Sequence, residues 1–252
     1  MGSRRPIVGV MCCNEQTSRP IQAVATRFVR PLADIAGASV VLVPAVADAV
    51  DAPSVADTLD GLLLTGSRSN VAGHRYAGPS DPDEPVDEER DEVALRMGAA
   101  MIERGRPVFG ICRGMQEINV LFGGTLSREA CGDRHLSGSW DDHEAIFAHR
   151  HDVVLTDGGL LSRSIGHRRI SVNSIHEQGV ARLGTGLRIE AIAPGDGLVE
   201  AVATDAGDAA VLAVQWHPEC DLAAPAGASF FTLLGAAVRG ASIHSFSTRG
   251  LQ

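Results

Sequence analysis

The sequence predicts an α/β fold in which a mostly parallel central sheet carries helices on both faces and ends in an antiparallel extension. In the first half of the 252 residues, short apolar runs alternate with helical stretches. This pattern is typical of parallel strands that are buried on both faces. In the second half, short strand-like runs follow one another closely, which indicates antiparallel pairing.

The first half contains four strand-like runs, each short and with an apolar centre. These strands are expected over residues 6–11, 39–44, 59–67 and 107–111. A helix is expected over residues 21–36, with Gly37 as its C-terminal stop. The acidic residues between 74 and 92 are expected in a solvated loop that leads into a helix N-terminus, where carboxylates favour the dipole.

The second half contains five further strand-like runs and a closing helix. The strands are expected over residues 151–156, 169–174, 187–193, 197–204 and 209–216, and the helix over residues 227–241. No linker rich in Pro, Gly or Ser divides the chain. We therefore expect residues 1–252 to form a single domain.

Composition and charge exclude several classes of protein. The formal net charge of −9 argues against a nucleic-acid partner and against an anionic membrane surface. No apolar stretch is long enough to span a bilayer, and the N-terminus lacks the apolar core of a secretory signal. The five cysteines show no C-x-x-C pair, so we expect free thiols in a reducing cytoplasm.

Residues 110–114, Gly-Ile-Cys-Arg-Gly, place a nucleophile between two glycines where an expected strand meets a helix-like run. Such a turn strains the backbone of Cys112 and lifts its side chain out of the sheet, while the glycines let strand and helix approach closely. The positive end of the helix dipole favours a thiolate, and the backbone N–H of Arg113 could donate to an oxyanion. The same turn could equally hold a buried, inert cysteine.

A base for this cysteine is suggested by the apolar run at residues 209–216, which ends in His217-Pro218-Glu219. Pro218 cannot donate to a strand ladder, so the strand should end there. Residues two apart in an extended chain point the same way, so Glu219 can lie beside His217 and hold its ring. A histidine at a strand end is by itself more often structural, but with Cys112 it completes a nucleophile, base and orienter.

Several segments together resemble one superfamily. "GICRGMQ" and "QWHPE" are typical of the class I glutamine amidotransferases, whose parallel sheet is flavodoxin-like. Within that superfamily, "GSRSNV", "VNSIHEQG" and "DGLVEAV" resemble the γ-glutamyl hydrolases of peptidase family C26. The resemblance covers nearly the whole chain. It implies hydrolysis of γ-glutamyl amides, such as γ-glutamyl-γ-aminobutyrate or γ-glutamyl polyamines, through a cysteine thioester and without a cofactor.

The resemblance also implies a role for each matching residue. Cys112 is the expected nucleophile, His217 the general base and acid, and Glu219 the residue that orients the base. The residues expected at the oxyanion hole are Gly66, Ser67 and Arg113. Relatives often carry proline where this chain has Arg68, which leaves the conformation of that loop open.

Other matching residues are expected to bind the substrate. Gln116 lies one helical turn after Cys112 on the same face, where it could reach the glutamyl group or brace the helix. The segment "NSIHEQG" is expected to line the pocket and bind the α-amino and α-carboxylate groups, although single residues in it could be structural. The residues expected there are Asn173, Ser174, His176 and Gln178.

A metal site is conceivable but not expected. Four histidines, His135, His143, His149 and His151, fall within a short stretch. No cysteine pair accompanies them, and their spacing matches no standard zinc site. We expect a loop followed by a strand.

Two other functions would use the same residues. A glutaminase that passes ammonia to a separate synthetase needs identical chemistry. A protein that only binds γ-glutamyl ligands would have little need of an intact Cys112, His217 and Glu219. The expected partner is a small γ-glutamyl amine, and a homodimer is left open. The acidic residues 81–92 favour a cationic leaving amine, whereas Arg68 favours one that carries a carboxylate.

Overall fold

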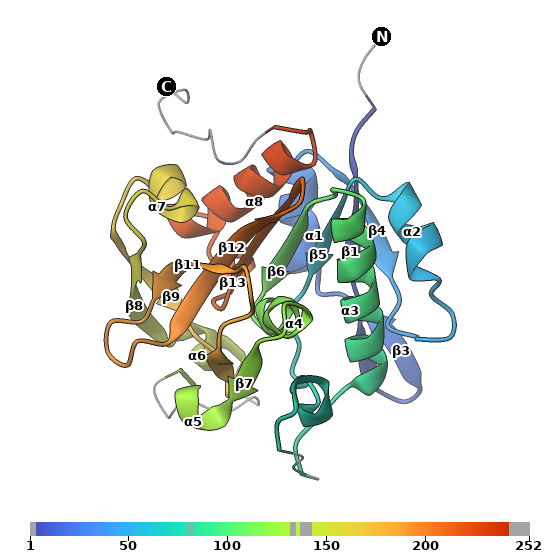
Figure 1. Ribbon diagram of the computed structural model, residues 1–252, viewed down its shortest axis with the longest axis horizontal. Helices are drawn as coiled ribbons and strands as arrows, with labels where there is room; N and C mark the ends of the chain where they lie inside the picture. Colours follow the sequence, from blue (N-terminus) through green and yellow to red (C-terminus); the bar gives the residue numbers. More distant parts are fainter. Residues whose placement is uncertain (1–3, 80, 82, 132–134, 137–142, 242–252) are drawn as a thin grey trace.

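The largest element of the computed structural model is a mixed sheet, in which the described residues form nine strands (Figure 1). The structure describes residues 4–79, 81, 83–131, 135–136 and 143–241, with the side chains of 143–145 excepted. In spatial order the strands are β4 (Ser39–Val43), β1 (Ile7–Met11), β5 (Gly61–Leu64), β6 (Val108–Ile111), β13 (Ala209–Val214), β12 (Val199–Ala206), β11 (Arg188–Ile192), β8 (Arg150–Leu155) and β9 (Arg169–Asn173).

The sheet has a parallel half and an antiparallel half. Strands β4, β1, β5, β6 and β13 pair in parallel, and β12, β11, β8 and β9 extend the sheet with antiparallel pairs. Two small antiparallel sheets join β2 (Cys13–Gln16) to β3 (Pro20–Ala23) and β7 (Thr125–Ser127) to β10 (Gly179–Arg182). The predicted mostly parallel α/β sheet with an antiparallel extension is confirmed.

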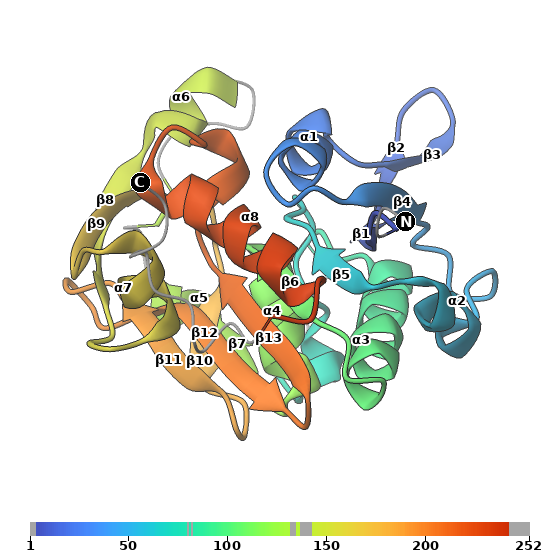
Figure 2. The same ribbon diagram turned by 90° about the horizontal axis from the view of Figure 1, so that it is seen from above.

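Helices cover both faces of the sheet and bury two separate cores (Figures 1 and 2). One face carries α1 (Thr26–Asp34), α7 (Leu160–Ile165) and α8 (Pro225–Ala237), and the other carries α2 (Ala52–Thr58), α3 (Glu88–Glu103) and α4 (Arg113–Leu121). Alternate residues of one strand enter opposite cores, as Leu63 and Leu64 of β5 do. The shorter elements are α5 (Arg128–Cys131), α6 (His143–Ala148), η1 (Gly73–Tyr76) and η3 (Pro218–Cys220). In the part of the chain that is described, none of the helices has the length and apolar character to cross a bilayer.

Two details of the sequence prediction were wrong. The strand expected at 209–216 belongs to both halves of the sheet, because β13 pairs in parallel with β6 and antiparallel with β12. The helix expected over 21–36 begins only at Thr26, because the preceding residues form strand β3 and their backbone pairs with β2. Its predicted stop is confirmed, since Gly37 has a φ of +66°.

The acidic segment ends as predicted at a helix N-terminus. Asp87 caps α3 by accepting a 3.0 Å hydrogen bond from the backbone N–H of Arg90, and acidic side chains fill the first turn. Carboxylates there complement the positive end of the helix dipole. The cap therefore sets where α3 begins and brings Arg90 into the protein interior.

A buried ionic cluster joins α3 to α4. Its members are Arg90 and Asp91 of α3 and Arg113 and Glu117 of α4, and each side chain is at most 1% exposed. Arg90 Nε lies 3.0 Å from Glu117 Oε1, and an Arg113 guanidinium nitrogen lies 2.6 Å from Asp91 Oδ1. Arg113 also pairs with Glu117 one turn along its own helix. Two cations thus share two carboxylates, which offsets the cost of removing four charges from water.

Replacement of Glu117 with Gln should lower the free energy of unfolding by about 3–5 kcal/mol, because two buried guanidinium groups lose a shared carboxylate. The matched control is Asp57→Asn, which breaks a pair with Arg104 whose carboxylate is 68% exposed and should change stability little. Urea denaturation followed by circular dichroism measures both. Similar losses in the two variants would contradict a stabilising role for the cluster.

Candidate active site

Cys112 occupies a strained turn between β6 and α4. Its φ of +52° and ψ of −105° lie outside the regions that residues with a side chain normally adopt. Such strain persists only where the surrounding structure enforces it, and it is concentrated at functional sites. The turn matches the predicted nucleophile elbow and directs the cysteine away from the helix that follows.

The two flanking glycines are required by close backbone contacts. A Cβ atom at Gly110 would lie 2.7 Å from the backbone of Gly114, and one at Gly114 would lie 2.1 Å from the carbonyl oxygen of Leu64. Both distances are shorter than real Cβ contacts, so strand β6, helix α4 and the end of β5 meet with no room for a side chain. The glycines therefore bring the end of β5 next to Cys112.

His217 and Glu219 form a buried pair beyond β13. The strand ends at Val214 and not at Pro218 as predicted, and Glu219 lies in η3, so a helical turn and not an extended segment brings it beside His217. His217 Nδ1 lies 2.7 Å from Glu219 Oε1, and the Glu219 side chain is fully buried. A Cβ atom at Gly66 would lie 3.5 Å from Cβ of Cys112 and 2.8 Å from Cε1 of His217. The thiol and the imidazole therefore flank the same point, as predicted for a nucleophile and its base.

The protonation of His217 is set by its neighbours. Burial lowers the pKa of this imidazole, but the charges of Glu219 and of a Cys112 thiolate, with hydrogen bonds to both, raise the pKa to about 10. The ring is therefore an imidazolium near neutral pH when Cys112 is a thiolate. An imidazolium beside a thiolate holds the proton that a leaving amine needs.

The loop after β5 is held against the elbow by the side chain of Arg113. Arg113 Nε donates to the carbonyl oxygen of Ser69 at 2.9 Å, and its guanidinium also donates to the carbonyl oxygen of Asn70 at 3.2 Å. The backbone N–H of Arg113 lies at the first position of α4, where no intrahelical acceptor exists. The structure thus places Gly66, Ser67 and this N–H around Cys112, where an oxyanion hole was predicted. That role remains a prediction.

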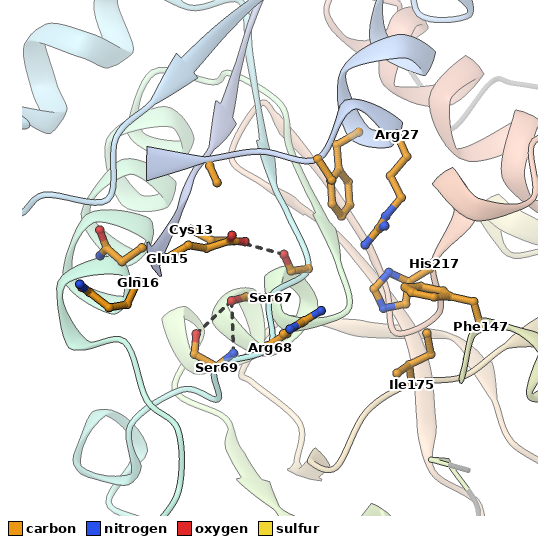
Figure 3. A pocket seen from close by; sticks show the side chains of 15 residues that line it. Cys13, Glu15, Gln16, Arg27, Ser67, Arg68, Ser69, Phe147, Ile175 and His217 are labelled. Atoms are coloured by element: carbon orange, nitrogen blue, oxygen red, sulfur yellow. Dashed lines mark hydrogen bonds between the residues drawn. The ribbon is translucent and has the colours of Figure 1, made fainter. Parts of the chain in front are cut away.

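Two cavities lie beside the cysteine and the histidine, one lined by His217 and the other by Cys112. One has a volume of about 430 Å³ and is lined by the β2–β3 hairpin, α1, the loop after β5, Phe147 and His217 (Figure 3). The other is much smaller, about 20 Å³, and Cys112, Gln116 and His176 contribute to its wall. Arg68 lines both. The thiol and the imidazole therefore each face a different cavity.

Among the residues of the larger cavity that were not predicted from the sequence, Arg27 and Phe147 contact the His217–Glu219 pair. Arg27 of α1 lies with Nε 3.6 Å from Glu219 Oε1, and its guanidinium carbon lies 4.8 Å from the ring centroid of Phe147. The ring of Phe147 in turn packs edge-on against His217, with centroids 5.4 Å apart. Neither belongs to a recognisable motif. The only sequence signal is that Phe147 is a rare aromatic residue in a chain with 4% aromatics.

The predicted substrate-binding residues divide into two groups. Gln116, His176 and Arg68 line a cavity. Burial lowers the pKa of His176 to about 4 against the opposing charge of Glu200, so this ring is neutral near pH 7. Gln116 also donates from Nε2 to the carbonyl oxygen of Gln178 at 2.8 Å, so it braces the helix as well.

The remaining predicted residues make internal contacts instead. Asn173 donates to the carbonyl oxygen of His217 at 2.9 Å and accepts from its backbone N–H at 2.7 Å. Ser174 donates to the carbonyl oxygen of His135 at 2.7 Å, and Gln178 donates to the carboxylate of Glu84. These three residues do not line either cavity. Their polar side chains hold loops and the base in place, which the sequence pattern alone could not distinguish from substrate binding.

The model of the family described as peptidase C26 matches residues 6–219, which include the elbow, the loop after β5 and the His217–Glu219 pair. The chain belongs to the peptidase C26 family. The γ-glutamyl-γ-aminobutyrate hydrolase of Escherichia coli (strain K12) is 37% identical over 221 residues, which cover 85% of each chain. A relative from Schizosaccharomyces pombe, described as a candidate glutamine amidotransferase, is 33% identical over 218 residues, covering 85% of this chain and 79% of its own.

The fold of this peptidase C26 member is also found in more distant proteins. A solved structure from Thermoplasma acidophilum, described as one component of a candidate GMP synthase, superposes with a TM-score of 0.64. It covers 95% of this chain and 98% of its own, with 20% sequence identity. At that identity the likeness shows the fold alone, which is that of the class I glutamine amidotransferases.

The raised pKa of His217 predicts how stability depends on pH. Because the folded pKa of about 10 exceeds the usual value of 6.5, the charged ring stabilises the fold fully below about pH 6.5, and this contribution is lost as the pH rises to about 10. The difference in free energy of unfolding between the wild type and His217→Gln should therefore be larger at about pH 6 than at about pH 9. Urea denaturation at both pH values measures it, with the exposed His167→Gln as control. A difference that stays constant with pH would contradict the assigned environment.

Proposed function

We propose that the protein hydrolyses γ-glutamyl amides to glutamate and a free amine through a thioester on Cys112. The observation that carries the proposal is the strained cysteine beside a histidine that a buried glutamate holds at 2.7 Å. The 37% identity to a γ-glutamyl-γ-aminobutyrate hydrolase supports the choice of substrate class. The hydrolase chemistry agrees with membership of the peptidase C26 family.

Acylation begins when the Cys112 thiolate attacks the γ-carbonyl carbon. The carbonyl oxygen becomes an oxyanion, which the backbone N–H of Arg113 and the loop at Gly66 would stabilise. As the tetrahedral intermediate collapses, the C–N bond breaks and the His217 imidazolium gives its proton to the leaving amine. A γ-glutamyl thioester and a neutral imidazole remain, with Glu219 holding the ring in place.

Deacylation uses the same groups in reverse. Neutral His217 removes a proton from a water molecule, and the resulting hydroxide attacks the thioester carbonyl carbon. The C–S bond then breaks, so that glutamate leaves and Cys112 is again a thiolate beside an imidazolium. One water is consumed for each amide bond cleaved, and the protonation state of the site is restored.

The small cavity lies on the side of Cys112 where the glutamyl group would bind, but its volume of about 20 Å³ holds little more than one water, so its wall would have to open to admit the group. Gln116 and His176 line it, one helical turn and one loop away from Cys112, and Gln116 offers the polar side chain there. The larger cavity is then left for the amine. A leaving group of several carbons fits a space of about 430 Å³.

The charges around the larger cavity favour a leaving amine that carries a carboxylate. Arg27 and Arg68 line it and point toward the space beside His217, whereas Glu15 is the single carboxylate among the described residues that line it (Figure 3). None of the described acidic residues between 81 and 92 lines either cavity. The structure therefore removes the argument for a cationic amine that rested on this segment. We infer a preference for an ω-amino acid such as γ-aminobutyrate.

Variants of the three catalytic groups should differ in severity. Cys112→Ala and His217→Ala should each lower kcat by about 10⁶-fold, whereas Glu219→Ala should lower it by roughly 10⁴-fold, because an orienting residue is more replaceable than the groups that react. Release of glutamate from γ-glutamyl-γ-aminobutyrate measures this, and intact-mass spectrometry after acid quenching detects the thioester. The matched control is Cys12→Ala, which removes a buried thiol elsewhere and should retain turnover. Retained activity in Cys112→Ala would defeat the mechanism.

The choice of amine can be tested at Arg68. Arg68→Gln should lower kcat/KM for γ-glutamyl-γ-aminobutyrate by about 10–100-fold, the range expected for losing a hydrogen bond to a charged group. The value for γ-glutamylputrescine should change little, since that substrate carries no carboxylate on its amine side. The control is Arg104→Gln, which alters an arginine that pairs with Asp57 outside the candidate site.

Two results would overturn parts of this proposal. Equal losses for both substrates in Arg68→Gln would show that the arginine supports the loop and does not select the amine. Poor turnover of all γ-glutamyl amines, together with ammonia release from glutamine that a co-purifying protein stimulates, would favour a glutaminase that serves a separate synthetase.

A further inference from the structure

A second group of titratable side chains surrounds the buried carboxylate of Glu200. Relative to Glu200 Oε1, His135 Nδ1 lies at 3.3 Å, His151 Nε2 at 3.5 Å and His176 Nε2 at 3.8 Å. Glu200 is on β12 and His151 on β8, while His135 follows α5 and His176 follows β9. Four segments that are distant in the sequence therefore converge on one carboxylate.

The outer contacts of two rings leave their inner nitrogens without a proton. His176 Nδ1 lies 3.1 Å from the carbonyl oxygen of Gln178, an acceptor, so this nitrogen carries the proton of the neutral ring. His135 Nε2 likewise lies 3.0 Å from Asp196 Oδ2. When both rings are neutral, lone pairs on His176 Nε2 and His135 Nδ1 face the carboxylate of Glu200. Burial lowers the pKa of His135, but the neighbouring carboxylates of Glu200 and Asp196 raise it above the usual value, so a proton and a metal ion compete for this position.

Acceptors thus face acceptors in a buried space. Within the described residues, neither oxygen of Glu200 has a hydrogen-bond partner, and neither do the inner nitrogens of His135, His151 and His176. A buried carboxylate without a donor is strongly destabilising, and such groups in native proteins are paired or bind a cation. The arrangement calls for a positive charge at its centre.

The spacing fits a metal ion. The ligand atoms of His135, His151 and Glu200 all lie within 4.8 Å of one another. In a tetrahedral zinc site with bonds of about 2.0–2.2 Å, ligand atoms are roughly 3.3–3.6 Å apart, which matches the separations of His135 and His151 from Glu200, 3.3 and 3.5 Å. A proton shared between imidazolium and carboxylate would instead bring nitrogen and oxygen to about 2.7–2.9 Å.

We propose that His135, His151 and Glu200 bind a divalent transition metal, with zinc the best match to this ligand set and His176 the nearest fourth ligand. Two imidazoles and a carboxylate are a known zinc combination. Asp196 completes the pattern, since a carboxylate commonly accepts from the outer nitrogen of a metal-binding histidine. The sequence spacing could not reveal the site, because Glu200 is remote from the histidines.

The site is structural. Its side chains are at most 16% exposed, and the ion would have no open position facing the larger cavity. It would tie the loop that contains His176 to the antiparallel half of the sheet. In that loop the carbonyl oxygen of Ile175 lies 3.9 Å from the sulfur of Cys112, so the metal would support one wall of the active site without taking part in the reaction.

The test is the metal content of the untagged full-length chain. After expression with zinc and desalting without chelator, inductively coupled plasma mass spectrometry should find about one zinc ion per chain. His151→Asn and Glu200→Gln should lose it, and the exposed His167→Asn should keep it. Asp196→Asn should weaken zinc affinity by about 10–100-fold. Cobalt added to chelator-treated protein should give the visible absorption of tetrahedral Co²⁺.

Thermal unfolding provides a second readout that does not depend on activity. Zinc should raise the Tm of the metal-free wild type but not that of His151→Asn. Glu200→Gln could fail to fold. The test therefore depends on His151→Asn and Asp196→Asn, whose wild-type side chains are partly exposed. A wild type that holds no metal and shows no zinc-dependent rise in Tm would overturn the proposal, as would zinc that persists in His151→Asn. If the wild type holds no metal and zinc does not raise its Tm, the cluster is instead a network of protonated histidines around Glu200.

Discussion

The contact of two buried arginines with two buried carboxylates is the constraint on which the candidate active site depends. Arg113 supplies the backbone N–H at the elbow, and its side chain holds the carbonyl oxygen of Ser69 in the facing loop. Arg90 reaches the carbonyl oxygen of Thr65 at the start of the same loop. Because Glu117 and Asp91 fix both guanidinium groups, helix α4 and this loop cannot shift separately. A buried ionic network of this kind fixes the relative positions of the elements it joins more reliably than it raises the free energy of unfolding.

Strand order explains how groups far apart in the sequence meet at one point. Strands β5, β6 and β13 are adjacent and parallel, so their carboxyl ends lie at the same edge of the sheet. Gly66 follows β5, Cys112 follows β6 and His217 follows β13. Ligands of open parallel sheets bind at this edge. Neighbouring strands therefore bring together the residues proposed as oxyanion loop, nucleophile and base, and no long loop is needed.

The sequence predicted the parts of the site that local patterns encode. The elbow is readable because two glycines flanking Cys112 have a single steric explanation. His217 is readable from its spacing to Glu219, although the strand ends at Val214 and not at Pro218. Asn173 was predicted to bind the substrate, because the sequence alone does not show which backbone groups a polar side chain will hydrogen-bond. Arg27 could not be found, since only the tertiary fold places it beside Glu219.

The antiparallel half of the sheet has its own part in positioning the base. Asn173, the last residue of β9, holds the backbone of His217 with two hydrogen bonds, at 2.9 and 2.7 Å. Its side chain therefore fixes the point at which the chain leaves β13, while Glu219 fixes only the orientation of the ring. The loop that follows Asn173 also carries Ile175, beside Cys112, and His176, beside Glu200. Because this one loop contacts the nucleophile, the base and the Glu200 cluster, a change at Glu200 should reach the active site through loop position and leave the reacting groups chemically intact.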